Sequence, residues 1–134
     1  MDKSKEQKDL SEKTIKGLHI LLAEDNELNM EIAEFMFQNE DAEVTKAWNG
    51  LEAVEIFEKS SPGEFDVILM DIMMPVMNGY NATKRIRSMN REDAKTIPII
   101  AMTANAFTED RLKAKEAGMD EHISKPVDGN LLVK

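Results

Sequence analysis

Residues 65–79 read FDVILMDIMMPVMNG and carry the strongest indication of the fold. Their first six residues, Phe65–Met70, form a run that is apolar except for Asp66 and has the length of a strand that is buried on both faces. The run stops at Asp71, and Pro75 and the pair Asn78-Gly79 then mark a loop. Strands buried on both faces lie inside parallel sheets that helices cover on each side. We therefore expect an α/β protein with this strand at the centre of its sheet.

Strands and helices are predicted to alternate on both sides of that run. Apolar runs at 18–23 and 97–102 predict two more strongly buried strands, and weaker patterns at 42–47 and 119–124 predict two outer ones. Helical periodicity lies between them, so the strands are expected to run parallel and to be joined by right-handed crossovers. Placing the three apolar runs at the centre predicts the strand order 2-1-3-4-5, a flavodoxin-like doubly wound (βα)5 three-layer sandwich.

Capping residues and apolar spacing locate the helices. Asn26 is a predicted N-cap, and Asn49 with Glu52 resembles a capping box. A fourth helix begins near Glu109 and is expected to end at Gly118. The residues predicted on the buried faces are, helix by helix, Leu28, Ile32, Phe35 and Met36; Leu51, Val54 and Phe57; Ala82, Ile86 and Met89; and Leu112, Ala114 and Ala117.

The two ends of the sequence differ from its middle. Residues 1–16 are polar and lack aromatic side chains, so we expect either a linker or a frayed helix that leads into a single domain at 17–134. Only eight residues follow Pro126. The last helix of the domain is therefore expected to be short or truncated.

Composition excludes several classes of protein. The sequence has 26 acidic and 17 basic residues and a formal net charge of −9, which suits a cation or a basic protein surface as partner and not nucleic acid. The absence of cysteine excludes disulfides, thiol nucleophiles and zinc–cysteine sites. No apolar run approaches the roughly 20 residues of a membrane helix, and no apolar stretch near the start resembles a signal peptide. A cytoplasmic location is the expectation.

Chemically active side chains gather where the predicted strands end. Glu24-Asp25 follows the first strand, Asp71 the third, Thr103-Ala104 the fourth and Lys125-Pro126 the fifth. In this architecture ligands bind at the carboxyl ends of the central strands. We therefore expect three carboxylates, one hydroxyl and one ammonium group to converge there.

Three neighbouring carboxylates repel one another unless something offsets their charge. At an effective dielectric constant near 20, a pair about 4 Å apart repels by roughly 4 kcal/mol, so the cluster needs a cation or raised pKa values. Oxygen ligands without histidine or cysteine favour Mg²⁺ or Mn²⁺. Thr103 and Lys125 add a hydrogen-bond donor and a positive charge. Together these groups describe a pocket for a transferable phosphoryl group with a carboxylate placed to attack it.

Four motifs in order resemble one known family. LLAEDN at 21–26, ILMDIMMPVMNG at 68–79, IIAMTA at 99–104 and HISKP at 122–126 each stand at a predicted strand end. From Leu18 to Val127 the sequence resembles the receiver domain of two-component response regulators. The sequence of these motifs is most similar to that of receivers attached to hybrid sensor histidine kinases.

The resemblance implies a role for each acidic residue. Asp71 would be the phosphoacceptor, receiving a phosphoryl group from phosphohistidine on a histidine kinase or a histidine phosphotransfer domain. Asp25 would bind Mg²⁺ directly, with Glu24 assisting through water. Asp71 and the backbone carbonyl of Met73 would complete the protein ligands. Such a protein is an autocatalytic phosphoacceptor and not a turnover enzyme, although its parent chain would be a hybrid kinase.

The resemblance also implies how the phosphorylated state is held. Lys125 would pair with the phosphoryl oxygens, while the Thr103 hydroxyl and the backbone N–H of Ala104 would donate hydrogen bonds to them. The bond between Lys125 and Pro126 is cis in the family. His122 stands at the switch position, where Tyr or Phe is usual, so a switch role and a plain packing role both stay open.

Phosphorylation would then shift the face formed by the helix that ends at Gly118, the strand at 119–124 and the segment after Pro126. The implied partners are protein phosphodonors, with no direct nucleic-acid or membrane contact and an optional dimer contact through that face. The location implied is cytoplasmic, which includes the cytoplasmic part of a membrane-bound sensor kinase.

Other classes fit the sequence less well. A degenerate receiver that only binds partners would not need all five pocket residues. A Mg²⁺-dependent phosphatase with an aspartyl nucleophile needs a second Asp two residues after the first, where this chain has Met73. A flavin carrier of the same fold needs a hydroxyl- and glycine-rich phosphate loop, where this chain has Glu24-Asp25. The glycines form neither GxGxxG nor a P-loop, which excludes common nucleotide sites.

Overall fold

The structure is a computed structural model that describes residues 17–103 and 108–124. The predicted lead-in at 1–16 lies outside the described residues, as do Ala104, Lys125, Pro126 and the predicted last helix. Of the helices in the described ranges, none combines the length and the apolar content that crossing a bilayer would take.

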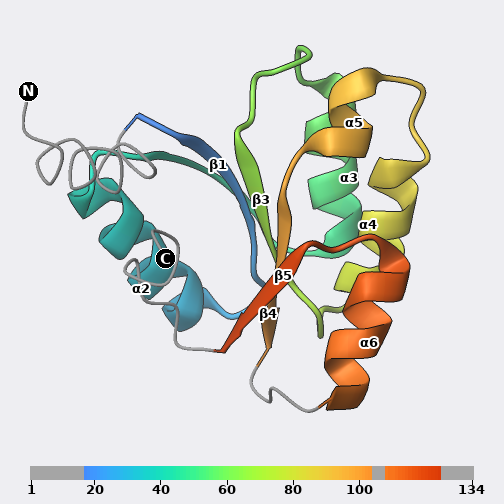
Figure 1. The fold of residues 1–134 in the computed structure, drawn as a ribbon. Coiled ribbons are helices and arrows are strands. Elements are labelled where there is room, and N and C mark those ends of the chain that lie inside the picture. The colour runs from blue at the N-terminus through green and yellow to red at the C-terminus, as the bar shows by residue number, and fades with distance from the viewer. Residues whose placement is uncertain (1–16, 104–107, 125–134) are drawn as a thin grey trace, which may run out of the picture.

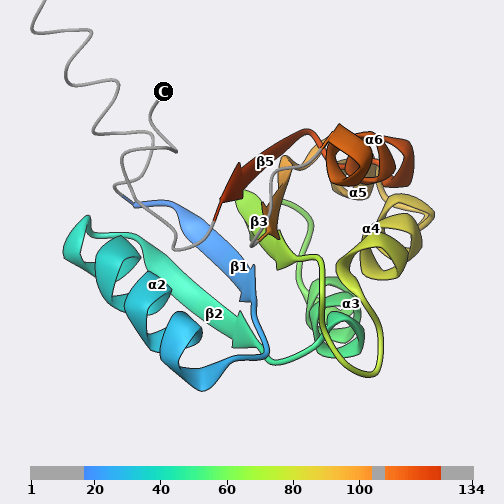
Figure 2. The ribbon, with the colours of Figure 1, turned by 90° about the horizontal axis from the view of Figure 1, so that it is seen from below.

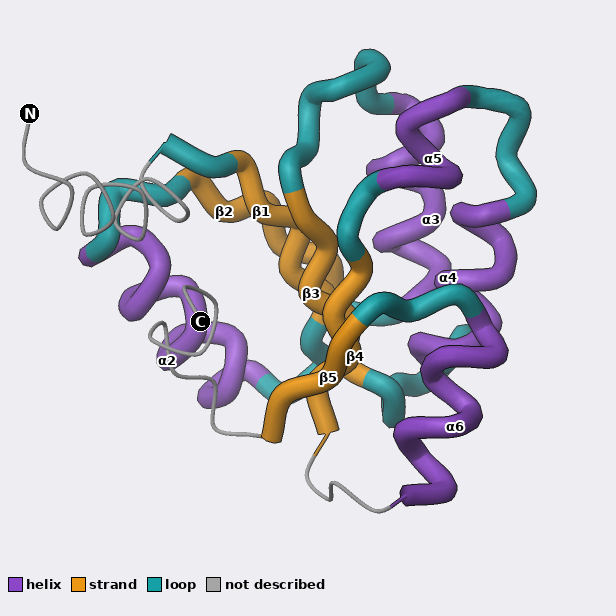
Figure 3. The backbone as a smooth tube through the Cα atoms, in the orientation of Figure 1, coloured by secondary structure: helices purple, strands orange, loops and turns teal. Residues whose placement is uncertain are grey.

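Five parallel strands form one sheet in the order β2-β1-β3-β4-β5, which confirms the predicted order and fold class. Because the strands are parallel, their carboxyl ends meet at one edge of the sheet (Figures 1 and 3). The strands are β1 His19–Ala23, β2 Glu43–Ala47, β3 Val67–Asp71, β4 Ile99–Thr103 and β5 Glu121–Ser124. The helices are α2 Glu27–Asn39, α3 Gly50–Lys59, α4 Gly79–Arg87, α5 Glu92–Thr96 and α6 Thr108–Ala117.

Helices cover the two faces of the sheet unequally. Among the described elements, α2 lies on one face and α3 to α6 lie on the other (Figure 2). The larger apolar core lies between the sheet and this second group, where Phe57, Ile68 and Ile86 are fully buried. The smaller core lies under α2 and includes Phe37 and Leu69.

Strand β3 is the centre of the fold, as its apolar run predicts. All five of its residues are buried, and its neighbours are β1 on one side and β4 on the other. The strand begins and ends later than predicted, so Asp71 is its last residue instead of the first residue of the following loop. This places the Asp71 carboxyl group at the sheet edge, held by a strand that is buried on both faces.

The predicted buried face of α2 is wrong. The buried residues are Met30, Ala33 and Phe37, whereas Leu28, Ile32 and Phe35 are exposed and Met36 is half-buried. Both sets have helical spacing because the helix is apolar on two sides. Asn26 caps the helix by accepting a hydrogen bond from the N–H of Asn29 at 2.9 Å. The path of the chain from β1 into the helix then determines which side of the helix packs against the sheet.

In the other helices, the buried residues agree better with those predicted from the sequence. Val54, Phe57, Ala82, Ile86, Ala114 and Ala117 are buried as predicted; Leu51 and Met89 are half-buried, and Leu112 is exposed. The side chain of Asn49 accepts from the N–H of Glu52 at 2.8 Å. The Glu52 carboxylate in turn accepts from the N–H of Trp48 at 2.9 Å, so the predicted capping box closes one residue earlier than expected.

The short helix α5 was not predicted, and an arginine holds it in place. The Arg91 guanidinium donates to both carboxylate oxygens of Asp93, at 2.6 Å and 2.8 Å. It also donates to the carbonyls of Phe57 and Ser60 at the end of α3 and lies 4.5 Å from the centre of the Phe57 ring. The start of α5 is therefore joined to the end of α3 by one side chain.

This contact makes a pH-dependent contribution to stability. The hydrogen bonds from Arg91, joined by the N–H of Gly63, lower the pKa of Asp93 from 3.8 to about 2. Since the pKa is lower in the folded state, the stabilisation is present above pH 3.8 and is lost as the pH falls toward about 2. We expect Asp93→Asn to cost about 2 kcal/mol of unfolding free energy at neutral pH.

The measurement is urea unfolding of the Asp93→Asn and wild-type chains at several pH values. The difference between them should shrink as the pH falls below 3.8. Glu92→Gln, at an exposed neighbouring position, is the matched control and should show no such trend. A constant difference at every pH would contradict the assignment to Asp93.

Candidate functional site

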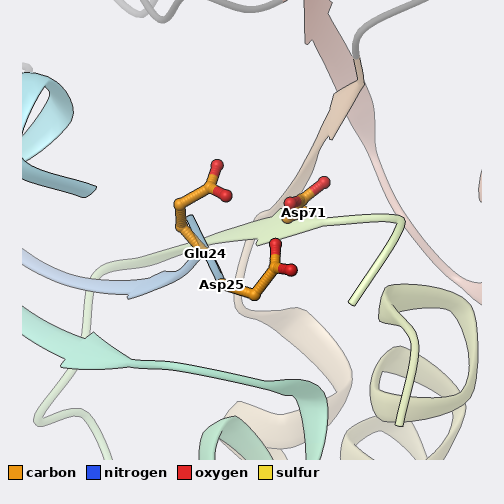
Figure 4. A group of neighbouring side chains, drawn as sticks. All are labelled: Glu24, Asp25 and Asp71. Atoms are coloured by element: carbon orange, nitrogen blue, oxygen red, sulfur yellow. The ribbon is translucent and has the colours of Figure 1, made fainter. Parts of the chain in front are cut away.

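Three carboxylates from two strands meet at the carboxyl edge of the sheet. Glu24 and Asp25 follow β1, Asp71 ends β3, and one oxygen of each lies within 4.8 Å of the others. Figure 4 shows the three side chains gathered where these strands end. The parallel pairing of Ala23 with Met70 brings the two strand ends together. The structure thus confirms that these sequence-distant acids converge.

Burial differs among the three acids. Glu24 and Asp71 are each 2% exposed, whereas Asp25 is exposed to solvent. Glu24 accepts a hydrogen bond from the N–H of Asn26 at 3.0 Å, and Asp71 accepts one from the N–H of Met73 at 3.3 Å. Two carboxylates about 5 Å apart repel by roughly 3 kcal/mol at an effective dielectric constant near 20. The cluster is therefore suited to a hard divalent cation, with Asp25 at its solvent side.

Two of the other predicted site residues, Thr103 and Met73, lie at the same edge. Thr103 ends β4, next to the strand of Asp71, and is 8% exposed. Met73 lies two residues beyond Asp71, with its side chain 78% exposed. Ala104, Lys125 and Pro126 are also predicted site residues, and they lie outside the described residues.

His122 lies on β5 and lines a groove. The residue pairs with Ala101 of β4 and is half-buried. The groove measures about 190 Å³ and runs between α6 and β5. Its lining residues are Ala114, Lys115, Met119, Asp120, Glu121 and His122. His122 therefore lines a surface groove and is also partly covered by the protein. Both the switch role and the packing role remain compatible with this position.

Two glycines position the loop after Asp71 and were missed by the sequence reasoning. A Cβ on Gly79 would lie 2.3 Å from the backbone oxygen of Asp71, and one on Gly50 would lie 2.2 Å from that of Met77. The Gly79 N–H donates to Ile72 at 2.9 Å, and the Gly50 N–H donates to Met77 at 3.0 Å. The signal was present, because each glycine follows an Asn that caps a helix, at a position where alanine is the better helix former.

Fold and site together define a class of protein. The 2-1-3-4-5 parallel sheet is a flavodoxin-like fold, and it carries a cluster of three acids at the ends of its central strands, where proteins of this architecture bind their ligands. Residues 20–134 match the family described as the response regulator receiver domain. The chain belongs to this family and is a receiver domain of two-component phosphorelay signalling.

The curated relatives are histidine kinases, and some of them, such as hybrid signal transduction histidine kinase L of Dictyostelium discoideum (38% identical, covering 81% of this chain and 6% of that protein), are hybrid kinases by name. Histidine kinase 1 of Arabidopsis thaliana is 34% identical over an alignment 153 residues long. The alignment covers 92% of this chain and 13% of that protein. The chain thus spans a small part of the length of such relatives. The match lies in their receiver regions.

Solved structures agree with this assignment. The receiver domain of the sensor histidine kinase PA1611 of Pseudomonas aeruginosa is 40% identical, with a TM-score of 0.76 over 87% of this chain and 91% of that one. That structure has a magnesium ion coordinated in its active-site cleft. The Ssk1 receiver of Saccharomyces cerevisiae, crystallised with the histidine phosphotransfer protein Ypd1, is 28% identical, with a TM-score of 0.76 over 87% and 84% of the two chains.

Proposed function

We propose that Asp71 of this receiver accepts a phosphoryl group from phosphohistidine on a partner protein, in a reaction that depends on Mg²⁺. The observation that carries the proposal is the cluster of Glu24, Asp25 and Asp71 within 4.8 Å at the carboxyl edge of the sheet. A carboxylate at the end of a buried central strand has little freedom to move, so it is held ready for attack.

The transfer is a displacement at phosphorus. A carboxylate oxygen of Asp71 forms the new O–P bond while the N–P bond to the donor imidazole breaks. The electron pair of that bond stays on the imidazole nitrogen, which then takes a proton from solvent. Asp71 becomes an acyl phosphate, and no further residue has to act as a base, because a carboxylate nucleophile has no proton to lose.

The acidic cluster fits a magnesium ion by its donor chemistry. Asp25, Asp71 and the backbone carbonyl of Met73 are the proposed direct ligands, and Glu24 assists through water. A magnesium ion bound there offsets the negative charge of the carboxylates and of the phosphoryl oxygens. The PA1611 receiver, which holds magnesium in its cleft, supports this choice of metal.

The remaining pocket residues would hold the product and transmit the change. We assign the positive charge beside the phosphoryl group to Lys125, oriented by a cis bond to Pro126. Hydrogen bonds come from the Thr103 hydroxyl and the Ala104 N–H. Movement of Thr103 toward the acyl phosphate would shift the face formed by α6, β5 and the segment after Ser124, with His122 on that face.

Partners and location follow from the same assignment. The donor is a histidine kinase or a histidine phosphotransfer domain, as in the Ypd1–Ssk1 pair, and the parent chain is a hybrid kinase. The location is cytoplasmic, without direct contact to nucleic acid, and a dimer would use the face around α6 and β5. The alternative, a receiver that only binds partners, would take up no phosphoryl group.

Magnesium binding tests the metal part of the proposal. We expect Asp25→Asn to weaken Mg²⁺ affinity by about tenfold or more, because it removes a direct ligand from the exposed side of the cluster. The measurement is isothermal titration calorimetry with the whole 134-residue chain. Glu27→Gln removes the same unit of charge nearby without touching the cluster, and it should change the affinity far less. Equal effects of the two variants would mean that the ion is only attracted by overall charge.

A further inference from the structure

Arg87, the last residue of α4, joins that helix to the turn before β5. Its guanidinium donates to the carbonyl of Gly118 at 2.9 Å and to the carboxylate of Asp120 at 2.9 Å. It also donates to the carbonyls of Ala94 and Ile97, at 3.1 Å and 2.8 Å, where the chain approaches β4. One side chain, 17% exposed, therefore holds the start of β5 and the approach to β4 together.

The turn between α6 and β5 is shaped to admit the Arg87 side chain. Gly118 has a φ of +107°, and a Cβ there would lie 3.0 Å from Cγ of Arg87. Glycine thus supplies both the backbone conformation and the space that this contact needs. Arg87 and the turn therefore form one packed unit.

Asp120 joins β5 to β4 by a second route. Its N–H donates to the carbonyl of Ile99 at 2.8 Å, and its Oδ2 atom accepts from the N–H of Ile99 at 2.8 Å. The same Oδ2 atom accepts the hydrogen bond from Arg87. Ile99 is the first residue of β4, and Asp120 directly precedes β5. These bonds therefore define which residues of the two strands lie opposite each other.

Strand β5 depends on such contacts because it is short and lies at the edge of the sheet. It has four residues, and β4 is its neighbour in the described part of the sheet. A shift of one residue in strand pairing exchanges the two faces of a strand. The pairing ends with Ser124 opposite Thr103, at the edge of the sheet where Asp71 lies. The register set at the start of β5 therefore also decides how its end is placed at that edge.

We propose that Arg87 and Asp120 are positioning residues for phosphoryl transfer, which set the register of β5 and so place Lys125 beside the phosphoryl group. Lys125 directly follows Ser124 in the sequence. The inference rests on the proposed function, in which Lys125 supplies the positive charge there. Neither positioning residue touches the reacting atoms, because their bonds meet the first residue of β4, about 13 Å along the strand from its last.

The test compares two arginines with similar contacts. Arg87 and Arg91, with side chains 17% and 15% exposed, each bond to an aspartate and to backbone carbonyls. Arg87→Met and Arg91→Met should both lower the urea midpoint of unfolding. Only Arg87→Met should slow the labelling of Asp71 by acetyl phosphate, by about tenfold, under conditions where both chains are folded. Its Mg²⁺ affinity, measured by calorimetry, should stay unchanged, because the acidic cluster lies at the ends of β1 and β3.

A double-mutant cycle tests whether Arg87 acts through Lys125. Lys125→Ala should itself slow labelling, and adding Arg87→Met to it should cause little further loss. Asp120→Ala is the second variant, for use where Arg87→Met does not fold. It removes the shared acceptor from a side chain that is 52% exposed, and it should slow labelling in the same direction.

Each outcome identifies the level at which the assignment fails. Equal labelling rates of the two methionine variants, full additivity with Lys125→Ala, or a loss of Mg²⁺ affinity would show that Arg87 only stabilises the fold, and would overturn the inference. Unchanged labelling of Lys125→Ala would refute the role of Lys125 and the inference with it, while leaving Asp71 as the acceptor. Labelling of Asp71→Asn would refute the proposed function itself.

Discussion

Asp71→Asn should take up no phosphoryl group from acetyl phosphate in the presence of Mg²⁺, whereas the wild-type chain should gain the mass of one. The substitution replaces the attacking carboxylate oxygen by an amide, which is not a nucleophile at neutral pH. It preserves the shape of a side chain that is 2% exposed, so the fold should survive. Intact-protein mass spectrometry measures the result, and the loss should be complete.

The matched control for this experiment is Asp41→Asn. Asp41 carries the same carboxyl group at the turn between α2 and β2, and its φ of +64° suits asparagine as well as aspartate. This variant should be labelled like the wild type. Labelling of Asp71→Asn to the wild-type level would show that another side chain is the acceptor, and a wild-type chain without any labelling would favour the receiver that only binds partners.

Gly79→Ala should damage both the fold and the site. Its added methyl group would lie 2.3 Å from the backbone oxygen of Asp71 and 3.0 Å from Cα of Ile72, so the end of β3 and the start of α4 must move apart. We expect a loss of about 2–4 kcal/mol in unfolding free energy, although alanine is the better helix former. Chain that still folds should bind Mg²⁺ more weakly, because the Asp71 carboxyl group is displaced.

Gly63→Ala provides the comparison. Gly63 has a φ of +81° but nothing within 4 Å of the added methyl group, so it tests backbone conformation without steric overlap. Its cost should be about 1–2 kcal/mol, with no change in Mg²⁺ affinity or in labelling. Urea unfolding and calorimetry measure both variants. A Gly79→Ala chain with wild-type stability and labelling would contradict the close approach of α4 to β3.

The order of the strands was predictable because it depends on simple periodicity. Uninterrupted apolar runs identify strands buried on both faces, and right-handed crossovers leave few ways to arrange five parallel strands. The acidic cluster was predictable for the same reason, since parallel strands bring their carboxyl ends to one edge whatever their separation in sequence. Glu24 and Asp71 are 47 positions apart, yet they meet.

The buried face of α2 was not predictable from spacing. The set of Leu28, Ile32 and Phe35 and the set of Met30, Ala33 and Phe37 both satisfy helical periodicity. Only the position of the helix against the sheet decides which set is covered. The same holds for α5, whose five residues carry no clear periodicity and depend on Arg91 contacts to the end of α3.

The sequence by itself determined the strand order and the acids that share one edge, because both follow from local pattern and the rules of parallel sheets. Tertiary structure alone decided the exposed face of α2 and the close approaches at Gly50 and Gly79. The physical reason is that these features depend on distances between segments far apart along the chain, which no residue specifies until the others are packed against it.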